Sequence, residues 1–257
     1  MTHPVLDAML LGALRGVTEF LPASADGHLA LSELLFGVSP SSSALRVAFH
    51  AAAIVVVLWS ERHQFRSRAA DRLWGADGVA ILLASLPTLT LGLVFRDSAH
   101  AAATSPLILG LGFLGSSGWV LSTRWVSPGR QMHLSWLGAL VVGFAQGLSA
   151  FPGLSRCAGS LSCALWLGLR ADRAFDLSLL MALPAFVLAI AVDAPAIRNE
   201  PLLLEQTLVG FLLFAAGGLL ALAALRNLLQ NGKLWLVALW TLPLSLATLA
   251  LSWAWPR

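Results

Sequence analysis

Two short stretches of this 257-residue chain place polar and charged side chains inside sequence that is otherwise apolar. Residues 15–28 read RGVTEFLPASADGH, and residues 152–160 read PGLSRCAGS. Their ionisable side chains are Arg15, Glu19, Asp26, His28 and Arg156. An ionised side chain at the centre of a bilayer costs about 2.5–3.5 kcal/mol on insertion scales, so charges in such sequence indicate function. The pattern predicts one site formed by residues 15–28 and 146–160.

The types of these residues point to chemistry on a phosphate group. Arg156 follows Ser155 and precedes an apolar helix, where a guanidinium, a hydroxyl and free backbone N–H groups can surround an anion. His28 titrates near neutral pH, and Glu19 can orient a histidine or hold a divalent cation such as Mg²⁺ or Ca²⁺. Anion binding and acid–base catalysis are therefore the predicted activities.

Structural roles are the alternative for the same side chains. Arg15 and Glu19 are four residues apart on an expected helix and can form an ion pair. Arg156 can pair with Glu19 or extend to the membrane surface, since buried charges often neutralise one another. His28 can serve in local packing, and Asp26 can be the N-cap of a helix that begins at the next residue.

Two further residues are expected to be structural. His50 lies within a long apolar segment and is expected to be a hydrogen-bonded core residue. Cys157 is one of only two cysteines, both in apolar sequence, and is expected to be a small core residue.

The composition fixes the class of protein that holds these residues. Hydrophobic residues make up 58% of the chain and charged residues 11%, against about a quarter charged in a soluble domain. The basic residues form no patch interleaved with aromatics, which excludes nucleic acid as a partner. The sequence predicts an all-α membrane protein with six transmembrane helices, at about 45–60, 78–95, 105–122, 176–193, 207–225 and 234–253.

Two more apolar regions, 5–37 and 134–169, are broken near their middle, at Glu19 to His28 and at Pro152 to Gly159. Non-helical backbone at membrane depth is tolerated only where protein buries it or where it lines a wet cavity. Each region is therefore expected to be a re-entrant helix pair, with the two breaks facing a common pocket.

The two broken regions align at an offset of 131 residues. Residues that match include Gly12 with Gly143, Gly16 with Gly147 and Ser24 with Ser155. Each match is followed by a return helix and three spans, and an odd number of spans turns the second half upside down. The sequence predicts a single membrane domain, 1–257, made of inverted repeats at about 5–122 and 134–253, with the ligand site at their interface.

Orientation follows from the positive-inside rule. The loops 61–77, 123–133 and 226–233 are predicted to be cytoplasmic, because they carry Arg62, Arg66, Arg68, Arg72, Arg124, Arg130, Arg226 and Lys233. The loops 96–104 and 194–206 carry one arginine each and are predicted to lie outside. Trp59, Trp74, Trp119, Trp125, Trp235, Trp253 and Trp255 lie near predicted span ends, as in an aromatic belt.

The two polar stretches resemble the motifs of the undecaprenyl-diphosphate phosphatases of the bacitracin-resistance type. The first motif of that family is close to EGxTEFLPxSSTGH and the second to PGTSRSGAT. The resemblance extends over essentially the whole chain. It implies a multi-pass protein of the bacterial inner (plasma) membrane that removes the terminal phosphate of undecaprenyl diphosphate, usually with a divalent cation. This reaction recycles the lipid carrier for peptidoglycan synthesis and underlies bacitracin resistance.

Carried over by position, the resemblance assigns roles to single residues. Glu19 is the motif carboxylate and the candidate metal ligand, and His28 is the acid–base histidine. Ser155 and Arg156 form the diphosphate clamp. Other expected substrate-binding residues are Gly153, Arg15, Gln146 and Ser160.

The chain departs from the motifs at two important places. Arg15 replaces the first glutamate, which weakens a cation site and favours a diphosphate headgroup. Ala25 replaces the serine proposed as the nucleophile of the family. Three routes remain: attack by Ser24, attack by Asp26, or direct attack by water with His28 or Glu19 as base. The alternative function is a catalytically silent relative that binds or translocates a polyprenyl phosphate lipid.

Overall fold

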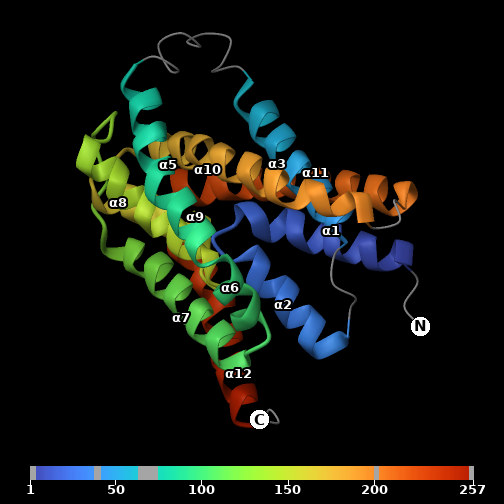
Figure 1. The fold of residues 1–257 in the computed structure, drawn as a ribbon. Helices are drawn as coiled ribbons and strands as arrows, with labels where there is room; N and C mark the ends of the chain where they lie inside the picture. The colour runs from blue at the N-terminus through green and yellow to red at the C-terminus, as the bar shows by residue number, and fades with distance from the viewer. Residues whose placement is uncertain (1–3, 38–41, 63–74, 200–202, 255–257) are drawn as a thin grey trace.

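The computed structural model describes residues 4–37, 42–62, 75–199 and 203–254, and the secondary structure of these residues is helical apart from one isolated bridge between Gln131 and Leu169. The first half contains α1 (Pro4–Phe20), α2 (Ala25–Phe36), α3 (Ser43–Ser60), α5 (Ala76–Val94), α6 (Arg96–Ala103) and α7 (Pro106–Ser122). The second half contains α8 (Trp136–Gly147), α9 (Arg156–Trp166), α10 (Ala171–Asp193), α11 (Leu204–Gln230) and α12 (Ala238–Ala254). Figure 1 shows their arrangement.

Six helical segments are long and apolar enough to cross a membrane: Ser43–Ser60, Ala76–Val94, Pro106–Trp125, Ala171–Arg198, Leu204–Gln230 and Leu234–Ala254. These segments coincide with the six predicted spans, so the prediction of an all-α protein with six candidate transmembrane helices is confirmed. The chain is a multi-pass membrane protein.

The remaining helices of the two broken regions form short pairs, α1 with α2 and α8 with α9. The first pair is interrupted after Phe20, where Pro22 cannot supply a backbone N–H to continue the helix. The second is interrupted around Gly153, whose φ of 88° lies in the region that favours glycine. The breaks therefore lie where the sequence places them, while the re-entrant course of the pairs stays a prediction.

Serine caps the helix that follows each break. The Ser24 hydroxyl accepts a hydrogen bond from the Gly27 N–H at 3.3 Å, and the Ser155 hydroxyl accepts one from the Ala158 N–H at 3.3 Å. The expectation that Asp26 is the first cap is wrong, because α2 begins at Ala25 and Asp26 already lies in its first turn. Both caps lie at matching positions of the offset of 131 residues.

The main helix contacts join the two halves. Helix α1 packs along α11, α8 along α5, α7 against α12, and α3 against α10. Figure 1 shows α1 and α11 side by side. A Cβ added at Gly16 would lie 2.8 Å from the Cα of Phe214, and one added at Gly147 would lie 3.0 Å from the Cα of Thr88. Small residues thus let α1 and α8 approach their partner helices closely.

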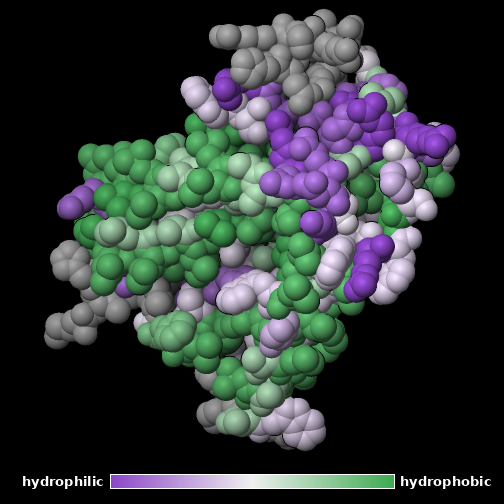
Figure 2. All heavy atoms as spheres, turned by 180° about the vertical axis from the view of Figure 1, so that it is seen from behind, coloured by the Kyte–Doolittle hydropathy of each residue, from purple (hydrophilic) through white to green (hydrophobic). Residues whose placement is uncertain are grey.

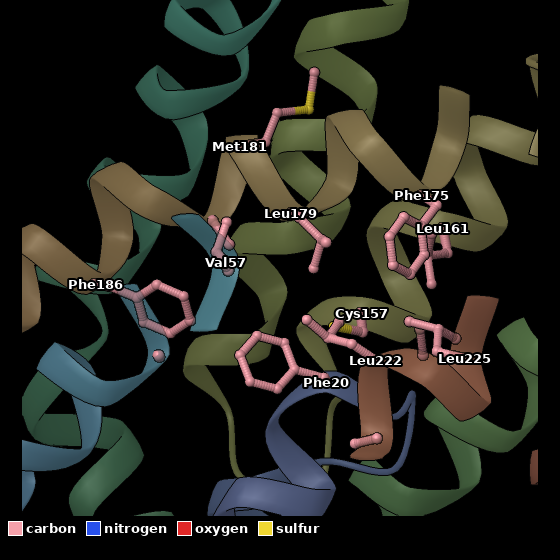
Figure 3. Close-up of a cluster of buried hydrophobic side chains, with 14 of the residues drawn as sticks. Phe20, Val57, Cys157, Leu161, Phe175, Leu179, Met181, Phe186, Leu222 and Leu225 are labelled. Atoms are coloured by element: carbon pink, nitrogen blue, oxygen red, sulfur yellow. The ribbon is translucent and has the colours of Figure 1, made fainter. Parts of the chain in front are cut away.

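The core and the surface suit a lipid environment. A continuous cluster of buried side chains runs between the helices, with Phe20, Cys157, Leu222 and Leu225 close together in Figure 3. The outer faces of the helices also expose large apolar side chains, such as Leu82 and Leu220, and Figure 2 shows a broad apolar surface with polar residues gathered at one end. Such a surface is expected where lipid takes the place of water.

A buried ion pair ties the ends of α5 and α10 together. Arg173 donates to both carboxylate oxygens of Asp77, at 2.7 and 2.6 Å, and His133 lies 3.2 Å from the same carboxylate. Of the predicted belt residues, Trp59, Trp125 and Trp253 are exposed. The side chains of Arg66, Arg68, Arg72, Trp74 and Trp255 lie outside the described residues.

Candidate active site

Residues from both breaks line one cavity of about 490 Å³. The predicted site residues that line it are Arg15, Glu19, Ser24, Asp26, Gln146, Ser155 and Arg156. They come from the end of α1, the start of α2, the end of α8 and the start of α9. The structure therefore brings the two polar stretches together, although more than 120 residues separate Asp26 from Ser155 in the chain.

Glu19 lies between two guanidinium groups. Arg156 Nη2 donates to one carboxylate oxygen at 2.6 Å, and Arg15 Nε lies 3.4 Å from the other. Arg15 also contacts Asp26, with 3.0 Å between Nη2 and the carboxylate. Both ion pairs considered from the sequence are present, and together they form a chain of alternating charge from Asp26 to Arg156.

The two arginines retain hydrogen-bonding capacity. Among the described residues, Arg156 Nε is buried with no hydrogen-bond partner, and Arg15 Nε is buried with only its 3.4 Å ion-pair contact to Glu19. Arg156 is held by stacking, since its guanidinium lies 4.1 Å from the ring centroid of Phe186. A buried donor without a partner is rare in proteins, and a cavity lined by two guanidinium groups is suited to an anion.

Two helix N-termini complete the wall. Helix α2 begins at Ala25 and α9 begins at Arg156, and both residues line the cavity. The first N–H groups of a helix lack intrahelical acceptors and carry partial positive charge, which favours anions. Each N-terminus adds to the positive potential of the guanidinium groups at the same place.

Ser24 has a strained backbone. Its φ of 69° and ψ of 95° make it the one non-glycine residue with positive φ in the described part of the chain. Its hydroxyl donates to the carbonyl of Leu154 at 3.3 Å and so joins the first break to the second. Strain of this kind persists where the surrounding contacts hold it, and it is frequent at functional sites.

His28 lies outside this arrangement. Its Nδ1 is 2.8 Å from the carbonyl of Ser24, and its Nε2 accepts from the indole of Trp240 at 3.0 Å. The ring is nearly parallel to that of Trp240, with 6.2 Å between the centroids, and meets Phe113 edge-on. His28 is not among the residues that line the cavity, so its acid–base role stays a prediction.

The remaining predicted site residues are Gln146, which lines the cavity, and Ser160 and Gly153, which lie near it. Gln146 donates to the carbonyl of Met181 at 3.0 Å, while its own carbonyl oxygen is buried with no partner among the described residues. Ser160 is fully buried and bonds to Ser178 and to the carbonyl of Arg156. Gly153 packs closely against the backbone of α7. Neither Ser160 nor Gly153 lines the cavity.

The residues present do not fit a divalent cation held by the protein. The described residues contain no group of three or more His, Cys, Asp or Glu side chains that could hold a metal ion. Both oxygens of Glu19, the expected ligand, contact guanidinium groups. The guanidinium groups of Arg15 and Arg156 thus lie where a metal ion bound to Glu19 needs open coordination positions.

Sequence reasoning missed several residues of the cavity. His50 was expected in the core, yet it lines the cavity and lies 3.4 Å from Arg15 Nη2. Arg46 and Asp193 form an ion pair at the rim, with 3.2 Å between their nearest charged atoms. These residues are far apart in the sequence and carry no motif, so only their helix contacts reveal them.

Comparison with known proteins identifies the family of the chain. A family model described as "Bacitracin resistance protein BacA" matches residues 8–247. A protein of Desulfatibacillum aliphaticivorans named undecaprenyl-diphosphatase is 31% identical over 90% of this chain and 92% of its own length. A protein of the same name in Korarchaeum cryptofilum is 29% identical over 96% of this chain and 99% of its own length. With a matching family model over nearly its whole length, the chain belongs to the bacitracin resistance protein BacA family.

Proposed function

We propose that this membrane protein hydrolyses undecaprenyl diphosphate to undecaprenyl phosphate and inorganic phosphate. The observation that carries the proposal is the convergence of Arg15, Arg156 and two helix N-termini on one cavity. A diphosphate bears about three negative charges near neutral pH, and this wall offers donors and positive charge without a protein-held metal. Relatives that are similar in sequence over most of their length carry the name of this activity.

The cavity also offers a path for the lipid chain. Leu89, Leu93, Leu188 and Val192 form apolar walls beside the charged residues. Arg96 and Asp193 also line the cavity, and they lie at the helix ends joined to the loops 96–104 and 194–206, which are predicted to be outside. The headgroup is therefore reached from the outer face of the bacterial inner membrane, with the prenyl chain directed between α5 and α10.

The pairing of helices supports an inverted repeat around this site. Helices α1 and α8 each pack on the fourth long helix of the opposite half, α11 and α5 respectively. The third helices, α3 and α10, contact each other, as do the fifth, α7 and α12. Two halves related by a two-fold axis in the membrane plane pair their equivalent helices in this way. The pairing supports a site at the interface of the halves.

Contacts in the cavity favour direct attack by water over the two covalent routes. The Ser24 hydroxyl is engaged as a donor to Leu154 and as the acceptor of the cap, and no basic side chain among the described residues is bonded to it. Asp26 is paired with Arg15. Arg15 and Arg156 then stabilise the charge that develops on the phosphoryl oxygens, and Glu19 holds both guanidinium groups in place before the substrate arrives.

The test is phosphate release from undecaprenyl diphosphate by the purified protein in detergent. It is run with added Mg²⁺ or Ca²⁺ and with a chelator, because a divalent cation is the usual companion of this family. We expect release in the wild type, loss of release in Arg156→Ala, and little effect of the chelator.

The matched control is Arg173→Lys. Arg173 is also buried and also lies 2.6 Å from a carboxylate, but it does not line the cavity. Release that survives in Arg156→Ala contradicts the proposed clamp. No release from the wild type, with the lipid still bound, makes the chain a binding or translocating relative instead.

A further inference from the structure

A second histidine, His50, reaches the charged centre of the cavity from α3. The Nη2 atom of Arg15 lies 3.4 Å from its Nε2. The imidazole ring is held on another side by Phe186, with 6.1 Å between the ring centroids. In contrast to His28, His50 lines the cavity.

The contact with Arg15 defines the protonation of the ring. A guanidinium nitrogen can only donate, so the Nε2 atom of His50 accepts and the proton of the neutral ring is on Nδ1. Among the described residues, Nδ1 has no hydrogen-bond partner. The only lone pair of the neutral ring is therefore on Nε2 and faces Arg15, a residue that itself lines the cavity.

The charges around His50 come from four elements. Arg15 on α1 and Arg156 on α9 are positive, while Asp26 on α2 and Asp193 at the end of α10 are negative. Glu19, also on α1, adds a third carboxylate and pairs with both guanidinium groups. A bound diphosphate adds about three negative charges at close range, which stabilises an imidazolium beside it.

The other half of the molecule shows that packing does not require a histidine here. The residue 131 positions after Arg15 is Gln146, and the residue 131 positions after His50 is Met181. Gln146 donates to the backbone carbonyl of Met181 at 3.0 Å. The contact between α8 and α10 thus uses a neutral amide and a carbonyl, whereas the equivalent contact between α1 and α3 uses a guanidinium and a titratable ring.

We propose that His50 is the general base of the hydrolysis, an inference that rests on the proposed function. When the diphosphate binds Arg15, Nε2 of His50 is released and takes a proton from the attacking water. The water oxygen bonds to the terminal phosphorus as the bond to the bridging oxygen breaks, and the electron pair of that bond stays on the bridging oxygen of the lipid monophosphate. The imidazolium then returns its proton to solvent or product.

The experiment compares His50→Gln with His133→Gln in the phosphate-release assay. Glutamine at position 50 keeps an acceptor for Arg15 but cannot carry the proton. We expect kcat to fall by about 10²–10⁴-fold with KM changed by less than about threefold, the usual size of a general-base effect. His133→Gln keeps kcat within about tenfold, because His133 contacts Asp77 and does not line the cavity.

A His50→Ala variant supplies the second readout. It leaves a space beside Arg15 that free imidazole can fill, and added imidazole is expected to restore release at least tenfold. Undiminished kcat in His50→Gln, or failure of imidazole to restore His50→Ala, overturns the proposal. A wild type that releases no phosphate indicates instead that the proposed function itself has failed, so the two failures are distinguishable.

Discussion

The two breaks are alike in the helices that flank them and differ in the charged residues that they carry. Each ends a glycine-containing helix that packs closely on a helix of the other half, and each is followed by a helix capped by serine. The first break carries Arg15, Glu19 and Asp26, whereas the corresponding positions of the second are Gln146, Ala150 and Cys157. The second break contributes one charge, Arg156, at the position that corresponds to Ala25.

Of the charged side chains that the two breaks contribute to the cavity, this difference puts most on the first break. Two identical breaks would place equal charges face to face, and like charges at short distance repel. Here Glu19 from one half lies between Arg15 from the same half and Arg156 from the other. The cavity therefore depends on both halves, and substitutions that make the breaks more alike are informative.

The largest effect is expected for Arg156→Lys. Lysine retains the charge but loses the planar fork that reaches Glu19 and stacks on Phe186. We expect kcat/KM for undecaprenyl diphosphate to fall about 10²–10³-fold, the usual effect of removing a donor that stabilises transition-state charge. Steady-state kinetics measure this, and unchanged kinetics would rule out the clamp.

A packing effect comes next, from alanine at the equivalent glycines. Gly16→Ala places a methyl group against the backbone of Phe214, and we expect it to destabilise the protein by about 1–3 kcal/mol. Gly147→Ala is expected to cost less, because its nearest neighbour, at 2.8 Å, is the movable side chain of Leu91. Thermal unfolding in detergent measures both.

Gly118→Ala is the control for these two variants, since a Cβ there has no atom within 4 Å. Equal stabilities of Gly16→Ala and the control would contradict the close approach of α1 and α11.

Arg15→Gln makes the first break resemble the second at this position. It removes one positive charge and the contacts to Glu19, Asp26 and His50. We expect KM to rise about tenfold, equivalent to about 1.4 kcal/mol of lost binding. Kinetics at varied lipid concentration test this, and a KM below that of the wild type would show that Arg15 opposes the substrate.

The smallest effect is expected for the matched caps, Ser24→Ala and Ser155→Ala. Each loses one N-cap hydrogen bond, which typically costs about 1 kcal/mol, so the two variants are expected to have similar stability. With water as the nucleophile, Ser24→Ala retains turnover. Complete loss of turnover in Ser24→Ala alone, with both proteins folded, would instead identify Ser24 as the nucleophile.

Much of the architecture could be predicted because local pattern determines it. Six apolar segments are long enough to span a bilayer, and the helices appear at those places. The charges of Glu19 and Arg156 indicated a shared site, because an unpaired charge in apolar surroundings is costly and needs a partner. The cap at Ser24 was missed since Asp26 is an equally good capping residue, and its carboxylate is drawn to Arg15 instead.

The placement of His28 has a reason that the sequence already contains. Asp26 and His28 are two residues apart on one helix and point about 200° away from each other. Once Asp26 faces the cavity, His28 must face away from it, toward Trp240. The helical period, applied to the motif, places the side chains of Asp26 and His28 on different faces of the helix.

The sequence by itself determined the class of protein, the positions of the spans and breaks, and the residues that carry charge in apolar surroundings, because hydrophobic length and desolvation act locally along the chain. Only the tertiary structure decided which of these charges meet and which histidine joins them. Those contacts link α1, α2, α3 and α9. These contacts depend on how the helices pack. Small residues such as Gly16 allow close packing, but they do not indicate which helix packs against them.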